Sequence, residues 1–223
     1  METQGATRTV QRALRLLAAV TESGGTLSDL ARTVELSPST TSRLLSTLTI
    51  SEFVRRDERG RYRPGARLRR LAAAALRDDP LFELAGPHLE QLAAETGETA
   101  NLAVSVQAGQ AIYLRQVTSP KLVQSAGWTG RAIPTRGTAL GAALRGDLGA
   151  GGFATRSGAV EPDVTSIAAP LYGPDGAIIA ALSVLAPTYR TTRRRVNTLG
   201  RAVAQHAGAL SRSLGAPTKE RAA

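Results

Sequence analysis

Cysteine is absent from this chain of 223 residues, which excludes disulfide bonds and thiolate metal sites. Histidine is almost as scarce: His88 and His206 are each expected on a helix, over a hundred positions apart, as separate surface or core residues. Neither stands beside a serine or carboxylate in an arrangement such as GxSxG or HExxH. We therefore expect no catalytic residues, no metal site and no cofactor, although a site assembled from distant loops stays open.

Long apolar runs are also missing. No stretch approaches the ~20 residues that a membrane span needs, and the first residues, METQGATRTVQ, lack the features of a secretory signal. We expect a cytoplasmic protein with no membrane partner. Hydrophobic residues make up 42% of the chain and charged residues 21%, which is enough apolar surface for one large or two ordinary domains.

Positive charge is concentrated in the first third of the chain, within a net charge of +10. Residues 1–77 contain fourteen arginines and seven acidic residues, a net charge of +7, and the remaining residues contribute +3. This asymmetry indicates that the first third faces a polyanion.

Residues 26–63 have the pattern of two short helices followed by a basic hairpin. Ser28 is a plausible N-cap of the first helix. Ser37 and Pro38 suit the N-cap and the first position of the second helix, because the cap oxygen accepts an orphan N–H and proline has none to lose. Helical spacing then gives the second helix a polar side and an inward side, the latter with Thr41, Leu44, Leu45 and Leu48.

The polar side of the second helix has the composition of a DNA recognition helix. Short side chains let a helix approach a groove floor, hydroxyls reach phosphates or base edges, and an arginine can pair bidentately with guanine. The expected DNA contacts are Ser39, Thr40, Ser42, Arg43, Ser46 and Thr47. The hairpin over residues 53–64 is a wing, from which Arg56, Arg59 and Arg61 would contact phosphates. The alternative is that this is only a solvated helix face, or a helix-turn-helix that contacts another protein. The N-cap, the polar side of the second helix and the basic wing together favour DNA binding.

Further helices are predicted on both sides of this motif. Residues 7–22 form an amphipathic helix with the stripe Val10, Ala13, Leu14, Leu17 and Val20. The alanine-rich residues 66–76 form a linker helix. Residues 81–96 form another, with Pro87 as a kink or a break and with core positions Leu84, Leu89 and Leu92. Domains are thus expected at 1–64, 65–80 and 81–223, and the helices near the hinge would pair across a dimer or connect the domains inside one monomer.

After residue 98 the hydrophobic period becomes that of strands. Strands are expected over residues 100–106, 111–117, 122–128, 167–171 and 178–185, and helices over 135–144 and 192–214, which makes a mixed α+β domain. Small residues at a helix start, a flexible glycine-rich loop over 146–152 and hydroxyls at strand ends predict an apolar pocket with few polar anchors, typical of ligand sensing. Trp128 would line the pocket mouth or fill the core.

Six runs follow one another along the chain: LSDLARTVELSPSTTSRLLSTL, RYRPGARLRRLA, TGETANLAV, GRAIPTRGTALGAAL, SIAAPLYGPDGAIIAALSVLAP and LSRSLG. In these runs and their order the chain resembles the IclR family of bacterial transcriptional regulators over nearly its whole length. The resemblance implies an α+β protein with an N-terminal winged helix-turn-helix domain, a linker helix and a C-terminal GAF-like effector domain. It also implies a repressor that binds a double-stranded DNA operator and a small organic acid or aromatic effector, in homodimers that often pair into tetramers.

The resemblance further implies effector contacts at Ala139, Leu140, Ser166 and Ser183. The chain departs from the family at Leu185, which replaces a second serine, and in the shortened segment 145–165, where Glu161 and Asp163 are loose candidates for the usual acidic contact. A less polar or differently seated ligand is implied. Glu35 stands where the family's helix turn generally has glycine, so a left-handed residue there would be strained. Apart from the resemblance, serines near strand ends usually bond neighbouring backbone.

Two other functions stay open. A DNA-binding protein that needs no ligand, and whose second domain serves assembly, would fit the shortened segment and the missing serine. A metabolic enzyme with a DNA-binding domain fits less well and would depend on His88 or His206.

Overall fold

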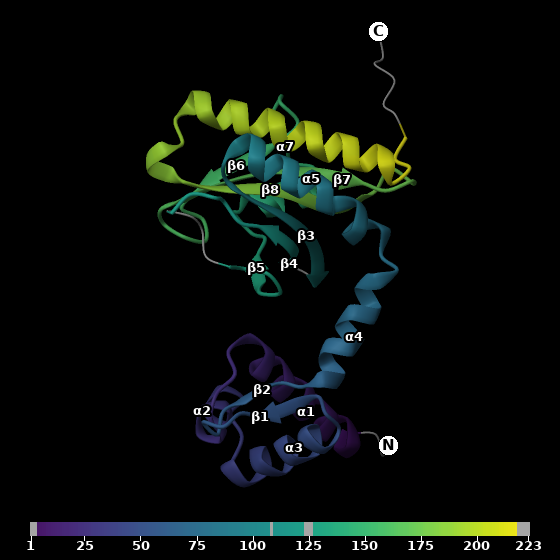
Figure 1. Ribbon diagram of the computed structural model, residues 1–223, viewed down its shortest axis with the longest axis vertical. Coiled ribbons are helices and arrows are strands. Elements are labelled where there is room, and N and C mark those ends of the chain that lie inside the picture. Colours follow the sequence, from purple (N-terminus) through teal and green to yellow (C-terminus); the bar gives the residue numbers. More distant parts are fainter. Residues whose placement is uncertain (1–3, 108, 123–126, 218–223) are drawn as a thin grey trace. The chain divides into compact units, whose positions relative to one another are not determined.

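The computed structural model describes residues 4–107, 109–122 and 127–217. The chain separates into two compact units, Met1–Asp78 and Asp79–Ala223, which are described in turn (Figure 1). The first is helical with a short hairpin, and the second is a sheet with helices on both faces. The α+β class predicted from the sequence is confirmed. Within the described ranges, no helix has the length and apolar character needed to cross a membrane.

The first unit is a three-helix core with a hairpin and a further helix. Its elements are α1 (Gln4–Glu22), α2 (Leu27–Thr33), α3 (Pro38–Ile50), β1 (Val54–Arg56), β2 (Tyr62–Pro64) and α4 (Ala66–Arg77). α1, α2, α3 and β1 meet in one apolar core, to which they contribute the buried side chains Leu16, Leu30, Leu45 and Val54. Burial of each such side chain contributes about 1.5–3 kcal/mol relative to an exposed position.

The apolar stripe predicted for α1 is wrong at two positions. Val10 is 57% exposed and Leu14 is 60% exposed, whereas Leu16 and Ala19 are buried together with Val20. The sequence places apolar residues on two adjacent faces of this helix. Packing against α3 and β2 decides which face is buried.

The start of α2 also differs from the prediction. Thr26 rather than Ser28 is the N-cap: the Thr26 hydroxyl accepts from the backbone N–H of Asp29 at 3.3 Å, and the Asp29 carboxylate accepts from the backbone N–H of Thr26 at 3.1 Å. This capping box satisfies two orphan donors reciprocally. After α2, Glu35 adopts a φ of 55°, a left-handed conformation that costs a residue with a side chain roughly 1–2 kcal/mol.

The second unit is built on one antiparallel sheet with strand order β5-β4-β3-β8-β7-β6. The strands are β3 (Thr99–Gln107), β4 (Gln110–Val117), β5 (Ala132–Pro134), β6 (Ala154–Ser157), β7 (Val164–Tyr172) and β8 (Ile178–Pro187). Helices α5 (Pro80–Thr96) and α7 (Arg193–Ser213) cover one face and bury the larger apolar core (Figure 1). Helix α6 (Ala139–Arg145) packs on the opposite face, over a second core.

Several predictions for this unit are corrected. The edge strands β5 and β6 were not predicted, because strands of three and four residues show little alternation. The strand expected over 122–128 falls largely on residues 123–126, outside the described ranges, and Leu122 and Trp128 belong to no strand. Leu84 is 39% exposed and is not a core residue. Helix α5 runs through Pro87 without a break, and the helix expected from residue 135 begins at Ala139.

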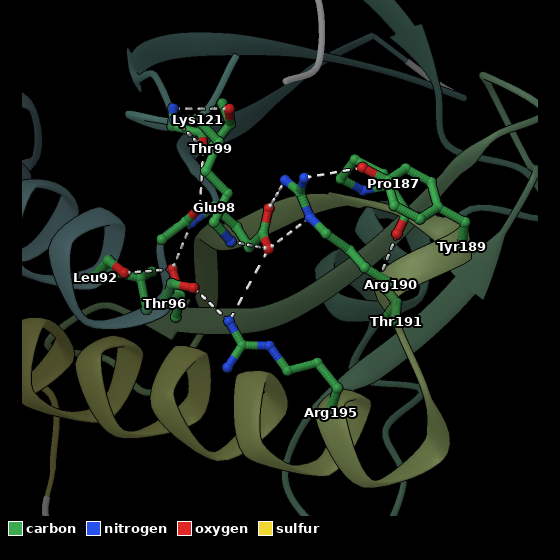
Figure 2. Close-up of polar contacts among 12 residues, drawn as sticks. Leu92, Thr96, Glu98, Thr99, Lys121, Pro187, Tyr189, Arg190, Thr191 and Arg195 are labelled. Atoms are coloured by element: carbon green, nitrogen blue, oxygen red, sulfur yellow. Dashed lines mark hydrogen bonds and ion pairs between the residues drawn. The ribbon is translucent and has the colours of Figure 1, made fainter. Parts of the chain in front are cut away.

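A buried carboxylate joins the start of β3 to the segment before α7. Glu98 is 1% exposed. It accepts hydrogen bonds from Arg190 Nη2 at 2.7 Å and from Lys121 Nζ at 2.9 Å (Figure 2). Arg195 Nη2 lies 4.0 Å from the same carboxylate and also donates to the backbone carbonyl of Thr96 (Figure 2). The surrounding cations offset the cost of burying this charge.

Candidate functional site

The polar side of α3 is open to solvent in the first unit. Ser39, Ser42, Arg43, Ser46 and Thr47 are exposed and Thr40 is half-buried, as the list of predicted DNA contacts requires. On the other side of the helix, Thr41 and Leu45 are fully buried. The helix begins where predicted, with the Ser37 hydroxyl accepting from the backbone N–H of Thr40 at 3.3 Å.

The side chains on this face are not equally available. Ser37 Oγ lies 3.1 Å from Ser39 Oγ and 2.9 Å from Thr40 Oγ1. Thr47 Oγ1 donates to a backbone carbonyl one turn earlier, at 3.1 Å. The side chains without a hydrogen bond or ion pair to any described residue are those of Ser42, Arg43 and Ser46. This trio is the part of α3 best prepared to bond a partner.

The tip of the β1–β2 wing is organised by Asp57. Its carboxylate accepts from the backbone N–H groups of Arg61 at 2.8 Å and Arg59 at 3.1 Å, and Arg63 Nε lies 3.4 Å away. The hydrogen bond from Arg61 makes the largest contribution to holding the pKa of Asp57 below its ordinary value. Gly60, with a φ of 72°, completes the turn.

The three predicted wing arginines differ in their surroundings. Arg59 is exposed at the tip. Arg56 is also exposed, but its Nε donates to the Gly60 carbonyl at 3.2 Å. Arg61 is half-buried, and its Nε is buried without a partner among the described residues. Of these three predicted arginines, Arg59 is therefore the one most open to a phosphate.

The second unit contains a small cavity between the sheet and α6, with a free volume of about 40 Å³. Its walls are mostly apolar, and Arg156, Glu161 and Ser166 are among the polar residues that line it. Of the predicted effector contacts, it is lined by Trp128, Leu140 and Ser166. Ala139 and Ser183 are fully buried and do not line it. Leu185, the residue that departs from the family pattern, forms part of the wall.

Trp128 is held in place by three polar contacts. Its indole Nε1 donates to Glu161 Oε1 at 2.5 Å, and its backbone N–H donates to Gln116 Oε1 at 3.0 Å. The Arg131 guanidinium lies 4.5 Å from the centre of the indole ring, in cation–π geometry. Of the two loose acidic candidates, Glu161 lines the cavity and Asp163 does not.

Tyr113 is a cavity residue that the sequence did not single out, because it lies inside a strand whose alternation carries no mark of a site. Tyr113 is buried, with 4% of the residue exposed. Burial raises the pKa of Tyr113 to about 12, the neighbouring Ser183 hydroxyl opposes this shift, and the Glu161 carboxylate adds to it. No hydrogen bond of normal geometry joins the phenol to Ser183. At neutral pH the cavity therefore contains a neutral phenol.

The two histidines, expected to be separate, are in contact. The Nδ1 atoms of His88 on α5 and His206 on α7 lie 3.3 Å apart, and His206 Nε2 lies 3.3 Å from a Glu95 carboxylate oxygen. Burial, and then the neighbouring His206, lower the pKa of His88. No cluster of three or more metal-ligating side chains is found in the described part of the chain. The contact was missed because 118 residues separate the two positions in sequence.

Comparison with known sequences identifies both units. The sequence profile of the IclR helix-turn-helix domain matches residues 9–58, and that of the C-terminal domain of the bacterial transcriptional regulator IclR matches residues 73–146 and 147–212. The acetate operon repressor of Salmonella typhimurium is 34% identical over 65% of this chain and 54% of its own length, so the chain spans about half of that relative. The regulator BhcR of Paracoccus denitrificans is 28% identical over 98% of this chain and 91% of its own.

Solved structures share the same fold. A putative IclR transcriptional regulator from Silicibacter sp. TM1040 matches with a TM-score of 0.77 at 27% identity, covering 94% of this chain and 97% of that one. An IclR homologue from Microbacterium hydrocarbonoxydans, complexed with 4-hydroxybenzoate, matches with a TM-score of 0.73 at 22% identity, covering 92% and 99%. Because the two sequence profiles together span most of its length, this chain belongs to the IclR family of bacterial transcriptional regulators.

Proposed function

We propose that this protein is a DNA-binding transcriptional repressor whose second unit senses a small-molecule effector. The observation that carries the proposal is the exposed face of α3, where Arg43 stands among short hydroxyl side chains beside a basic wing. Such a helix can enter the major groove and pair an arginine with guanine, while wing arginines bind phosphates at the groove edge. In this proposal, the base sequence of the DNA is read by Ser39, Thr40, Ser42, Arg43, Ser46 and Thr47. The affinity for the DNA backbone comes from Arg56, Arg59 and Arg61.

The effector site in this proposal is the cavity behind Trp128. Trp128, Leu140 and Ser166 contact the ligand, and Ala139 and Ser183 support the lining from behind. The 4-hydroxybenzoate bound by the Microbacterium homologue supports an aromatic compound or a small organic acid as the ligand class. Ligand pockets typically enclose about 300–1,000 Å³, whereas this cavity has about 40 Å³ free. An aromatic effector would therefore displace the Trp128 side chain.

Regulation in this proposal is a population shift in a homodimer or a dimer of dimers. Two recognition helices of a dimer meet half-sites about 34 Å apart on a palindromic operator. The effector stabilises one arrangement of the dimer, and only one arrangement fits that spacing. Residues 1–64 would bind DNA, 65–80 would form the linker, and 81–223 would bind effector and partner subunits. The protein would act in the cytoplasm and catalyse no reaction.

The test is binding of the purified protein to the DNA upstream of its own reading frame, with excess nonspecific competitor and at two salt concentrations. A specific operator gives binding that resists the competitor and weakens less with salt than binding to random DNA, because base contacts release no counterions. Binding no tighter than to random DNA, with and without candidate effectors, would contradict the proposal.

A repressor that needs no ligand is the second candidate, and the small free volume of the cavity favours it. Under this alternative, Trp128 fluorescence and operator affinity would both stay constant across a panel of organic acids and aromatic compounds. A change in either would exclude it.

A further inference from the structure

A row of polar side chains crosses the sheet beside the effector cavity. In the strand register, Asn101 on β3 is paired with Gln116 on β4 and with Ser183 on β8. Directly paired residues point to the same face of a sheet, and successive residues point to opposite faces. The adjacent pair, Leu102 and Leu182, belongs to the core under α5 and α7. The polar row therefore points to the opposite face, which carries the cavity.

Two members of this row are buried with polar atoms that lack a hydrogen-bond partner among the described residues. Asn101 and Ser183 are both 0% exposed. Asn101 Oδ1 and Nδ2 and Ser183 Oγ make no hydrogen bond to any described residue. Leaving a buried polar group unbonded is costly, and nearly all such groups in folded proteins bond to protein, water or ligand. A small polar molecule would satisfy these atoms.

The row lies between residues that line the cavity. On one side, Tyr113 on β4 is paired with Ala103, which lies two positions after Asn101 on β3. On the other side, Leu185 follows Ser183 by two positions along β8 and is paired with Ser166. Tyr113, Leu185 and Ser166 all line the cavity. Since side chains two positions apart on a strand are neighbours on one face, Asn101 and Ser183 lie on the cavity side of the sheet, next to these lining residues and behind the wall that they form.

We propose that Asn101 binds the polar head of the effector and selects a carboxamide, or another head that carries one donor and one acceptor side by side. The inference rests on the proposed effector role of this cavity. An amide head donates to Asn101 Oδ1 and accepts from Asn101 Nδ2, so both atoms are satisfied, whereas a carboxylate accepts only and leaves Oδ1 unpaired.

The charges around the cavity favour the same head group. Among the described residues that line the cavity, the only cation is Arg156, which is exposed, and Glu161 also lines it. A carboxylate bound beside Asn101 would be buried without a charge partner among these lining residues, which is far more costly than burying a neutral amide that is hydrogen-bonded.

The first test uses the wild-type protein and two probe pairs matched in size, acetamide with acetate and propionamide with propionate. Binding is measured by the shift in Tm and by the fluorescence of Trp128, the single tryptophan of the chain. We expect both amides to raise the Tm at millimolar concentrations and the acids to bind at least about tenfold more weakly. Acids that bind as well as amides, or amides that have no effect at about 100 mM, would overturn the proposal.

The second test replaces Asn101 with leucine, a side chain of similar size without polar atoms. We expect Asn101→Leu to raise the Tm of the free protein by about 2–4 °C, because unbonded buried polar atoms are removed, and to abolish the amide shift. Asn197→Leu is the matched control: Asn197 is exposed on α7, and its replacement should leave the amide shift unchanged. An Asn101→Leu protein that has a lower Tm and retains the amide shift would show that Asn101 is structural, held by a buried water molecule.

Two further comparisons keep the result decisive. If Asn101→Leu does not fold, Asn101→Asp replaces the donor with an acceptor in the same shape, and amide binding should weaken at least about tenfold.

The probes bind without DNA, so amide selectivity in a protein that ignores its upstream DNA would overturn the regulator function and leave the role of Asn101 intact. Operator binding without amide selectivity would overturn the proposed role of Asn101 and leave the regulator function intact.

Discussion

The indole of Trp128 and the carboxylate of Glu161 meet at 2.5 Å in a charge-assisted hydrogen bond, and both residues line the cavity proposed as the effector site. Arg131 packs against the same ring at 4.5 Å. These contacts hold the tryptophan in one position, and the free volume behind it is about 40 Å³. In the proposed effector role of this cavity, entry of a larger ligand therefore depends on the strength with which Glu161 retains Trp128.

Replacing Glu161 with alanine should release Trp128. The lost hydrogen bond to a charged group is worth about 1.5–3 kcal/mol. We expect the emission of Trp128 to shift to longer wavelength and to become more accessible to acrylamide, and both are measured directly because the chain has one tryptophan. Asp163→Ala, an exposed acidic position that does not line the cavity, is the control and should leave the emission unchanged. Identical quenching of the wild type and Glu161→Ala would contradict this prediction.

Replacing Arg43 with alanine should reduce specificity more than charge-driven affinity. The Arg43 side chain makes no hydrogen bond or ion pair with any described residue, so DNA binding would break none. Loss of one arginine–guanine pair costs about 1–3 kcal/mol. Arg59→Ala in the wing is the comparison, and it should weaken binding to all sequences alike and reduce the salt slope by about 1. Both are measured by titration of operator and random DNA. Equal losses on operator and random DNA for Arg43→Ala would disprove its role in sequence reading.

Acid should destabilise the second unit through His88. Burial and His206 lower the pKa of His88, so the unfolded chain, with a histidine pKa of about 6.5, binds the proton more readily than the folded chain. The stabilising contribution is complete above the unfolded pKa and is lost as the pH falls through the lower folded pKa. Glu95 lies beside the second histidine, 3.3 Å from His206 Nε2.

The measurement is the Tm of wild type and His88→Gln between about pH 7.5 and pH 5. We expect the wild-type Tm to fall below about pH 6.5 and the variant to have the smaller slope in that interval, with little difference between the slopes above it. Parallel curves over the whole range would show that His88 does not contribute.

Replacing Glu98 with glutamine should be strongly destabilising. The variant keeps the shape but leaves Arg190 and Lys121 facing a neutral amide, and breaking a buried ion pair costs about 3–5 kcal/mol. Glu90→Gln is the matched control, because Glu90 has an exposed side chain and lies 3.7 Å from Arg115, and exposed pairs contribute about 0–1 kcal/mol. Urea denaturation of both variants tests the difference. Equal midpoints for the two variants would mean that the Glu98 cluster adds nothing beyond a surface pair.

The features that the sequence predicted well are local ones. Ser37 and Pro38 mark the start of α3, and the spacing of Thr41 and Leu45 identifies its buried side, because caps and helical periodicity act over a few neighbouring residues. Local signals led to a wrong prediction where two nearby residues were both suitable as the N-cap of one helix. Ser28 could have capped α2, but Thr26 does so because Asp29 completes the capping box.

The cavity proposed as the effector site was only partly predictable. Leu140 and Ser166 came from the resemblance to the family, and Trp128 from its being the sole tryptophan. Tyr113 has no local mark, and Glu161 became a site residue only when the chain placed its carboxylate against the indole of Trp128.

Amino-acid order alone thus determined the recognition helix, the basic wing and the division into a helical part and a sheet part, since these depend on interactions between residues close in sequence. Tertiary structure decided which polar groups find partners. His88 contacts His206 across 118 residues, and Asn101 is buried beside Ser183 with its amide unbonded by any described residue. Such outcomes depend on strand register and on helix packing between distant segments, and a periodic pattern does not encode either.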